Sequence, residues 1–194
     1  MWFGRLISIF AGIIIFIILL VVLLTHGGKK PQPNPIQPLP SYAGTNAQVS
    51  FTTDGMVNAD QLHRSIRITV TNSEITLDVL KGYNPQIIRS KTFQNNQEAY
   101  TVFLKAINNS GFLAKTSNKK IPDDDAGQCP LGTRYILDLN NEGSDLSRTW
   151  ASSCGSNVGT SKAALGAIQT LFQAQVPGYD TLTSDVDLFA TAEQ

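Results

Sequence analysis

Residues 66–79 read IRITVTNSEITLDV, and this stretch decides the fold. Apolar and polar side chains alternate on both sides of Asn72-Ser73, which suits a two-residue turn between two strands. One register then places three apolar pairs on the same face: Val70 with Ile75, Ile68 with Leu77, and Ile66 with Val79. Because a slip of one residue would break all three pairs, the stretch predicts a β-hairpin and an antiparallel sheet.

Segments on either side of this hairpin extend the sheet. Residues 48–53 and 86–93 are typical of strands, and residues 82–85 (GYNP) predict a turn between the hairpin and the second of them. A second hairpin is predicted from residues 134–139 and 146–152, which flank a turn rich in Asn and Gly. Its expected pairs are Leu139 with Leu146, Leu137 with Arg148, and Tyr135 with Trp150. The last of these would be a cross-strand aromatic pair that contributes about 1 kcal/mol.

Two helices are predicted between and after these strands. The first is capped by Asn95 or Asn96, runs to Asn109 and ends at Gly111. Its apolar stripe consists of Ala99, Val102, Phe103, Ala106 and Ile107. The second begins near Thr160 or Ser161 and ends before Pro177-Gly178, with a stripe formed by Leu165, Ile168, Leu171 and Phe172. Residues 115–128 are polar and predict a loop.

The order of these elements is ββββαββα, which predicts an α+β domain over residues 48–178. Strands that come in hairpins favour a mainly antiparallel sheet, with the two helices on one face. Residues 179–194 form a polar C-terminal tail, which we expect to be only partly ordered.

The N-terminal segment, residues 1–26, predicts a transmembrane anchor. Residues 6–24 (LISIFAGIIIFIILLVVLL) contain no charge, and as a helix they would be about 28 Å long, close to the thickness of the hydrocarbon core. Trp2 suits one membrane interface and Lys29 and Lys30 the other. A cleaved signal peptide is the main alternative, but the residues that follow lack a small-residue cleavage site. The membrane is therefore the first expected partner.

A proline-rich linker follows over residues 27–47. Half of the ten residues from Pro31 to Pro40 are proline, and in the polyproline II conformation they would span about 30 Å. Such a segment would hold a domain away from the bilayer as a stalk. A proline-rich ligand for a recognition domain is the alternative.

The two cysteines, Cys129 and Cys154, lie at the base of the second predicted hairpin and predict a disulfide. A disulfide indicates an oxidising compartment, so we expect a cytoplasmic N-terminus and an extracytoplasmic domain. The flanking charges alone do not orient the anchor, because both sides carry basic residues. Two reduced thiols in a cytoplasmic domain are the alternative.

Charge and motifs exclude several functions. From Ser41 onward the chain carries 12 basic and 15 acidic residues, so it offers no basic surface for nucleic acid. His63 could form a dyad with a cysteine, but we interpret it as a surface residue. Residues 117–120 match S-x-x-K without its companion motifs, and the glycine-rich residues 155–162 depart from the Walker spacing. We therefore assign no catalytic, cofactor-binding or metal-binding residue and expect no enzyme.

The segment from Asp138 to Asp145 is the strongest candidate ligand site in the sequence. Oxygen-bearing side chains at alternate positions followed by Gly143 are similar to the first half of a calcium loop. Thr149 stands at the twelfth position, where such a loop has a bidentate Glu. A hairpin turn has the same composition and is our interpretation. The acidic run 123–125 is interpreted as a solvated loop.

Four blocks of the chain carry a resemblance to other proteins: GTRYILDL (132–139), RTWASSCG (148–155), GTSKAAL (159–165) and LFQAQVPGYD (171–180). With the anchor and the linker, they resemble uncharacterised single-pass membrane proteins of ultra-small candidate-phylum bacteria. This resemblance implies a cell-envelope location and no particular activity.

We expect a membrane-anchored protein that displays an extracytoplasmic interaction domain for an envelope or extracellular protein. An envelope hydrolase or a protease-inhibitor-like domain is the alternative, and a deep pocket with acidic residues or His63 would favour it. A pilin-like subunit is a further alternative, although the prolines from residue 31 forbid a long continuous N-terminal helix.

Overall fold

The computed structural model describes residues 16, 35–155 and 159–191. The chain divides into two units, Met1–Pro35 and Ile36–Gln194, and the description below concerns the second. The predicted anchor, residues 6–24, lies outside the described residues except for residue 16, and so do residues 27–34 of the predicted linker. Residues 35–47 of that linker are described. Among the residues that are described, no helix has both the length and the apolar character needed to cross a bilayer.

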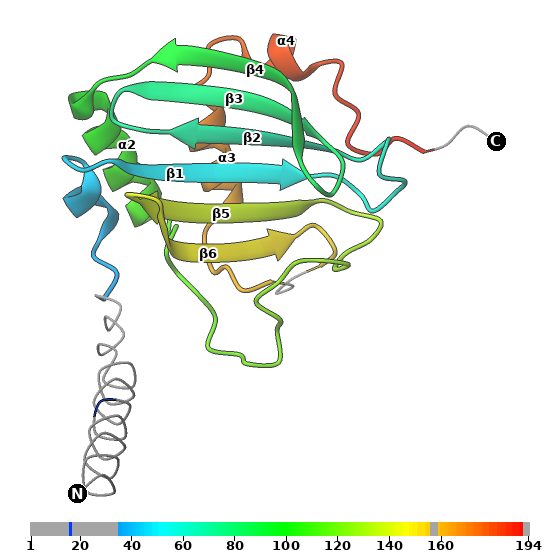
Figure 1. Ribbon diagram of the computed structural model, residues 1–194, viewed down its shortest axis with the longest axis horizontal. Helices are drawn as coiled ribbons and strands as arrows, with labels where there is room; N and C mark the ends of the chain where they lie inside the picture. The colour runs from blue at the N-terminus through cyan, green and yellow to red at the C-terminus, as the bar shows by residue number, and fades with distance from the viewer. Residues whose placement is uncertain (1–15, 17–34, 156–158, 192–194) are drawn as a thin grey trace, which may run out of the picture. The chain divides into compact units, whose positions relative to one another are not determined.

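Six antiparallel strands form a single sheet in the second unit (Figure 1). In chain order they are β1 (Ala47–Asp54), β2 (Arg64–Val70), β3 (Glu74–Lys81), β4 (Gln86–Gln94), β5 (Arg134–Asn141) and β6 (Ser144–Ser152). Their order across the sheet is β4-β3-β2-β1-β5-β6, so β1 pairs with β5 although three strands and a helix lie between them in the chain. The predicted α+β class with an antiparallel sheet is confirmed.

The first predicted hairpin is confirmed to the residue. β2 and β3 pair Val70 with Ile75, Ile68 with Leu77 and Ile66 with Val79. All six of these side chains are buried. The alternating pattern and the short turn determine one register, because any shift would expose the apolar side chains of both strands.

The second hairpin has the predicted strands but a different register. Next to the turn Asn140 pairs with Asp145, as the prediction requires, but a β-bulge follows and Leu139 pairs with Ser147. Leu146 is the extra residue, so every later pair is displaced by one position. The predicted pair of Tyr135 with Trp150 is wrong for this reason. Their side chains lie on opposite faces of the sheet, and Tyr135 pairs with Ala151.

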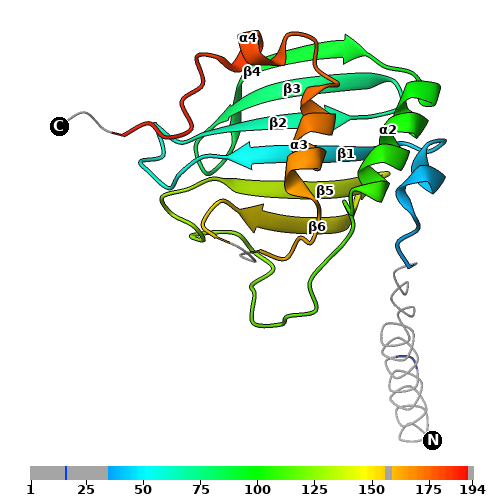
Figure 2. The ribbon, with the colours of Figure 1, turned by 180° about the vertical axis from the view of Figure 1, so that it is seen from behind.

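Helices α2 (Gln97–Asn109) and α3 (Leu165–Gln173) cover one face of the sheet (Figure 2). The Asn96 side chain caps α2 by accepting a hydrogen bond from the backbone N–H of Ala99 at 2.9 Å, as predicted. Its buried stripe differs in part, because Tyr100 and Leu104 are buried while Val102 is 63% exposed. The buried stripe is therefore rotated about the helix axis relative to the predicted one.

The core between the helices and the sheet is rich in aromatic rings. Phe172 of α3 is fully buried, and its ring contacts those of Phe51, Phe103 and Phe112 at centroid distances of 5.0–6.0 Å. The buried Tyr100 hydroxyl donates a hydrogen bond to the carbonyl of Ala47 at 2.8 Å, and burial raises the pKa of this hydroxyl. The apolar residues of alternate strand positions therefore form one continuous core with the helices.

The second helix begins later than predicted, at Leu165 rather than near Thr160. The residues before it extend along β6 instead. The backbone N–H of Ser161 donates to the Trp150 carbonyl at 2.8 Å, and the Thr160 hydroxyl accepts from the Trp150 N–H at 3.0 Å. These bonds occupy backbone groups of the sheet edge at β6, which explains why residues 159–161 are not helical.

Both ends of the domain extend beyond the predicted bounds. The 3₁₀ helix η1 (Leu39–Tyr42) places Leu39 fully in the core, so the domain begins before residue 48. At the other end α4 (Tyr179–Thr183) and the residues after it pack against the core, whereas a partly ordered tail was predicted. The Arg89 guanidinium of β4 holds this segment by donating to Asp185 at 2.8 Å.

Candidate functional site

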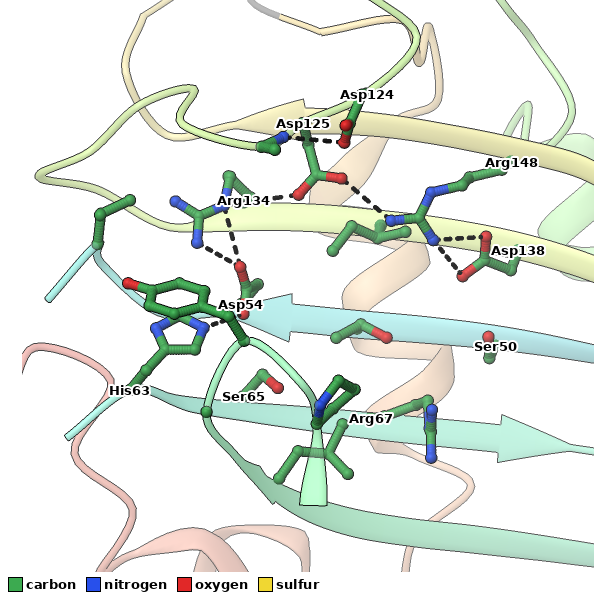
Figure 3. Close-up of a pocket in the computed structure, with 18 of the residues that line it drawn as sticks. Ser50, Asp54, His63, Ser65, Arg67, Asp124, Asp125, Arg134, Asp138 and Arg148 are labelled. Carbon is green, nitrogen blue, oxygen red and sulfur yellow. Dashed lines mark hydrogen bonds and ion pairs between the residues drawn. The ribbon is translucent and has the colours of Figure 1, made fainter. Parts of the chain in front are cut away.

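The sheet face that α2 and α3 leave uncovered is polar and carries a groove of about 430 Å³ (Figure 3). Strand register places its side chains in rows that cross the sheet. The rows are Leu80, Ser65, Asp54 and Arg134; then Asp78, Arg67, Thr52 and Ile136; then Thr69, Ser50, Asp138 and Arg148. Hydroxyls and charged groups thus share one face with few apolar side chains.

One wall of the groove is the long loop between α2 and β5. This loop crosses β6 and covers Trp150, whose ring N–H donates to the carbonyl of Pro122 at 2.9 Å. Trp150 is fully buried by this contact. The loop then places Asp124 and Asp125 at the rim of the groove. The β-bulge that turned Trp150 to this face is therefore also what gives the loop an apolar surface to pack on.

Arg134 of β5 lies at the inner end of the groove and is almost fully buried. Its guanidinium forms an ion pair with Asp54, in which Nε donates to the carboxylate at 3.0 Å. It also donates to the carbonyl of Gly55 at 2.8 Å and to that of Gln128 at 3.2 Å, and it faces Asp125 at 3.6 Å. Because so many donors are satisfied, this group links β1, β5 and the loop wall rather than facing a ligand.

Arg148 of β6 is the more accessible of the two arginines on this side, with half of its side chain exposed. It donates to Asp125 at 3.0 Å and to Asp138 at 3.1 Å. Burial raises the pKa of Asp138 above the ordinary value of an aspartate, although the charge of Arg148 opposes this shift. Arg148 therefore compensates only in part for the burial of the Asp138 carboxylate.

His63 is buried under the groove and not a surface residue, so that interpretation was wrong. It is 2% exposed, its Nε2 lies 2.8 Å from a carboxylate oxygen of Asp54, and its Nδ1 lies 3.1 Å from the carbonyl oxygen of Met56. Both neighbours are hydrogen-bond acceptors, so each ring nitrogen of His63 already faces a partner within the protein. A cysteine dyad is excluded, because both cysteines are bonded to each other.

Tyr83 forms the opposite rim and stacks on the His63 ring at a centroid distance of 4.2 Å. Its hydroxyl accepts from the backbone N–H of Asn58 and donates to the Asn58 carbonyl, both at 2.9 Å. Its backbone N–H donates to Asp60 at 2.8 Å. The side chain is nevertheless 50% exposed. It is an aromatic ring that is fixed in position and still open to solvent.

Three hydroxyls on the floor of the groove have no hydrogen-bond partner among the described residues: Ser50, Thr52 and Ser65. Arg67 lies beside Thr52 across the β1–β2 pair and donates to Asp78 at 3.1 Å. Asp78 in turn accepts from the Ser90 hydroxyl at 2.7 Å. The floor thus combines free hydroxyls with charged groups that already have partners.

The disulfide predicted from the sequence is present. Cys129 and Cys154 are bonded with a Cα–Cα distance of 5.6 Å, and they join the loop before β5 to the end of β6. The predicted calcium candidate is a hairpin turn in which Glu142 and Gly143 adopt positive φ. Three of its side chains are engaged within the protein: Asn140 accepts from the Gly143 N–H and donates to Asp145, and Asp138 accepts from Arg148.

The other motifs lie away from the groove. Residues 117–120 form a polar turn in which the Asn118 side chain accepts from the N–H of Lys120 at 3.1 Å. Within the described residues no group of three or more His, Cys, Asp or Glu side chains is placed to hold a metal ion. Residues 156–158 of the glycine-rich segment lie outside the description.

Sequence reasoning missed most of the groove. Asp54, Arg67 and Arg134 sit at outward-facing strand positions, where a charged residue ordinarily means contact with water. Only the pairing of β1 with β5, two strands 80 residues apart in the chain, brings Asp54 against Arg134. No protein-family model matches the chain, and a search of curated proteins finds no similar sequence.

Proposed function

We propose that this chain is a single-pass membrane protein that displays an extracytoplasmic binding domain on a proline-rich stalk. The apolar run of residues 6–24 supports the anchor, and the prolines from residue 31 support the stalk. The disulfide between Cys129 and Cys154 supports an oxidising compartment for the domain. The groove on the uncovered face of the sheet is the ligand site of this proposal.

The fixed and exposed ring of Tyr83 is the observation that carries the binding function. Half of the side chain faces solvent although three hydrogen bonds and a stacking contact hold it in place. An immobilised aromatic side chain loses little conformational entropy when a ligand contacts it. It borders a groove of about 430 Å³, within the usual range of small-ligand sites of about 300–1,000 Å³.

An envelope hydrolase is the second candidate, because the groove gathers several carboxylates and His63. Its groups are poorly suited to acid–base or nucleophilic catalysis. Asp54 and Asp125 are ion-paired with Arg134, and both ring nitrogens of His63 already have partners. A general base needs a free lone pair within reach of substrate. The paired state of these groups favours binding over hydrolysis.

Thiol labelling tests the proposed location. Cells that express the full chain are treated with a membrane-impermeant maleimide, with and without an impermeant reductant. Because the two cysteines of the chain are joined in a disulfide, we expect labelling of intact cells only after reduction. Labelling that requires lysis of the cells would contradict an extracytoplasmic domain.

A groove-filling variant tests the proposed site. Ser50→Trp places a large side chain on the groove floor, and Val102→Trp adds the same side chain to the exposed side of α2 as a control. Full-length protein in detergent micelles is sedimented with an envelope suspension from the expressing cells. We expect the wild type and Val102→Trp to co-sediment and Ser50→Trp to lose this binding. Equal binding of all three would reject the groove.

A further inference from the structure

We infer that the groove binds an uncharged oligosaccharide. This inference rests on the proposed function, since it names the chemical class of the ligand for the same site. Three features of the groove carry it: its paired charges, its free hydroxyls, and the fixed ring of Tyr83.

Most of the charged groups in the groove are paired with one another. Five carboxylates line the groove, and four of them have basic partners: Asp54, Asp78, Asp125 and Asp138. The fifth, Asp124 at the rim, accepts from the backbone N–H of Ala126 at 3.0 Å. The partners are three guanidiniums, those of Arg67, Arg134 and Arg148, together with the ring of His63. A charged ligand on the floor would have to displace one of these existing partners. The pairing of the floor groups therefore favours a ligand without charge.

The free groups of the floor match the hydroxyls of a sugar. Each of the hydroxyls of Ser50, Thr52 and Ser65 can donate one hydrogen bond and accept two. Arg67 donates one hydrogen bond to Asp78, and a guanidinium has five N–H donors, so further donors face the groove. Sugar hydroxyls also donate and accept at once, so they can satisfy mixed groups of this kind. A ligand with only donors or only acceptors would leave part of the floor unpaired.

A peptide fits this surface less well than a sugar does. The backbone N–H and C=O groups of β1, β2 and β5 are used between neighbouring strands, so the face of the sheet presents side chains alone. An extended peptide is ordinarily bound by the backbone groups of a free strand edge. On the face it would have to bury its own backbone groups against side chains, at a cost for each that stays unpaired.

Tyr83 supplies the apolar contact that a sugar ring needs. The face of a pyranose carries C–H groups, which pack against an aromatic ring, while its hydroxyls point outward to polar partners. Tyr83 is held by Asn58 and His63 and stands at the groove rim beside Val57 and Pro85. A sugar ring stacked there would extend its hydroxyls toward the floor. The aromatic rim thus suits the C–H face of a sugar ring, and the polar floor suits its hydroxyls.

Isothermal titration calorimetry tests the inference on the full-length chain in polyoxyethylene detergent, which carries no sugar headgroup. The probes are the uncharged tetramers of N-acetylglucosamine, β-linked glucose and α-linked glucose, with tetraglutamate and tetralysine as charged comparators. We expect at least one of the sugars to bind more tightly than either peptide. Tyr83→Ala should weaken that binding about tenfold or more, whereas Phe189→Ala, which removes a ring 54% exposed outside the groove, should leave it unchanged.

A second variant covers the case in which Tyr83→Ala fails to fold. Thr52→Val removes one free hydroxyl without changing the shape of the strand, and it should weaken sugar binding about three- to tenfold. The inference is overturned if no sugar binds, if a charged peptide binds more tightly, or if Thr52→Val binds as the wild type does. If the sugars fail while Ser50→Trp still abolishes envelope binding, the groove stands as the ligand site and only the class of ligand is wrong.

Discussion

The two faces of the sheet are built from alternate residues of the same strands, yet they differ in almost every property. The face under α2 and α3 is apolar and closed, with Phe172 fully buried among three other rings. The opposite face holds ion pairs, free hydroxyls and an open groove. Because the strand period is two, substitutions can alter one face and leave the other in place. Stability and binding should therefore be separable by mutation.

Loss of the central ring on the helix face should give the largest effect. Phe172→Ala removes contacts with Phe51, Phe103 and Phe112 and leaves a cavity, so we expect the free energy of unfolding to fall by about 3–5 kcal/mol. Urea unfolding measures this change. Phe189→Ala is the matched control and should cost less than about 0.5 kcal/mol. A loss below 1 kcal/mol for Phe172→Ala would mean that this face is not the main source of stability.

The groove face should also contribute to stability, through the ion pairs of Arg134 at the buried end of the groove. Arg134→Met leaves Asp54 and Asp125 without their shared partner, and breaking a buried ion pair in this way costs about 3–5 kcal/mol. Adding Asp54→Asn should recover part of that loss, because it neutralises one of the two carboxylates that lost the Arg134 guanidinium. Unfolding free energies of both variants measure this. A double variant less stable than the single one would contradict the assigned role.

The disulfide should contribute somewhat less than these buried groups. It joins residues 25 positions apart, which corresponds to about 3.5 kcal/mol in the chain-entropy model. The Cys129→Ser/Cys154→Ser double variant should lower the melting temperature, and reductant should lower that of the wild type by a similar amount. Reductant should not affect the double variant. An unchanged melting temperature in reductant would show that the loop is held without the bond.

The smallest effect should be a pH dependence at Asp138. Its pKa is raised by burial above the ordinary value of 3.8, so folding disfavours the ionised form. The stability linked to the protonated form is fully present below pH 3.8 and is lost as the pH rises through the raised pKa. Asp138→Asn removes this dependence, so its stability relative to the wild type should increase from about pH 3.8 upward. Urea unfolding over a pH series measures this, and a trend of opposite sign would contradict the shift.

The contrast between the faces also explains what the sequence could reveal. Hydrophobic alternation defines the helix face, and it predicted the β2–β3 register because six apolar residues agree on one pairing. The β5–β6 register failed because a bulge at Leu146 changes the pairing without changing the composition. The apolar pattern did not indicate the extra residue of the bulge, because it is compatible with a register that pairs Tyr135 with Trp150 and with one that does not.

Hydrophobic alternation predicted almost nothing about the groove face. Its residues are polar at outward positions, as on any solvated sheet, and His63 stood in a short polar segment. Burial of His63 depends on the stacked Tyr83 ring and on Asp54. Burial of Arg134 depends on a loop wall placed by Trp150. Contacts between residues so distant in the chain follow from the folded topology, and local periodicity does not encode them.

The central claim is that the uncovered face binds the ligand while the helix-covered face stabilises the fold. Amide chemical-shift mapping of the full-length chain in detergent micelles, titrated with the tetrasaccharide that binds best, tests it most directly. We expect shifts at Ser50, Thr52, Ser65 and Tyr83, with little change in α2 and α3. Shifts concentrated on the helices or on β4, or no shifts at millimolar sugar, would contradict it.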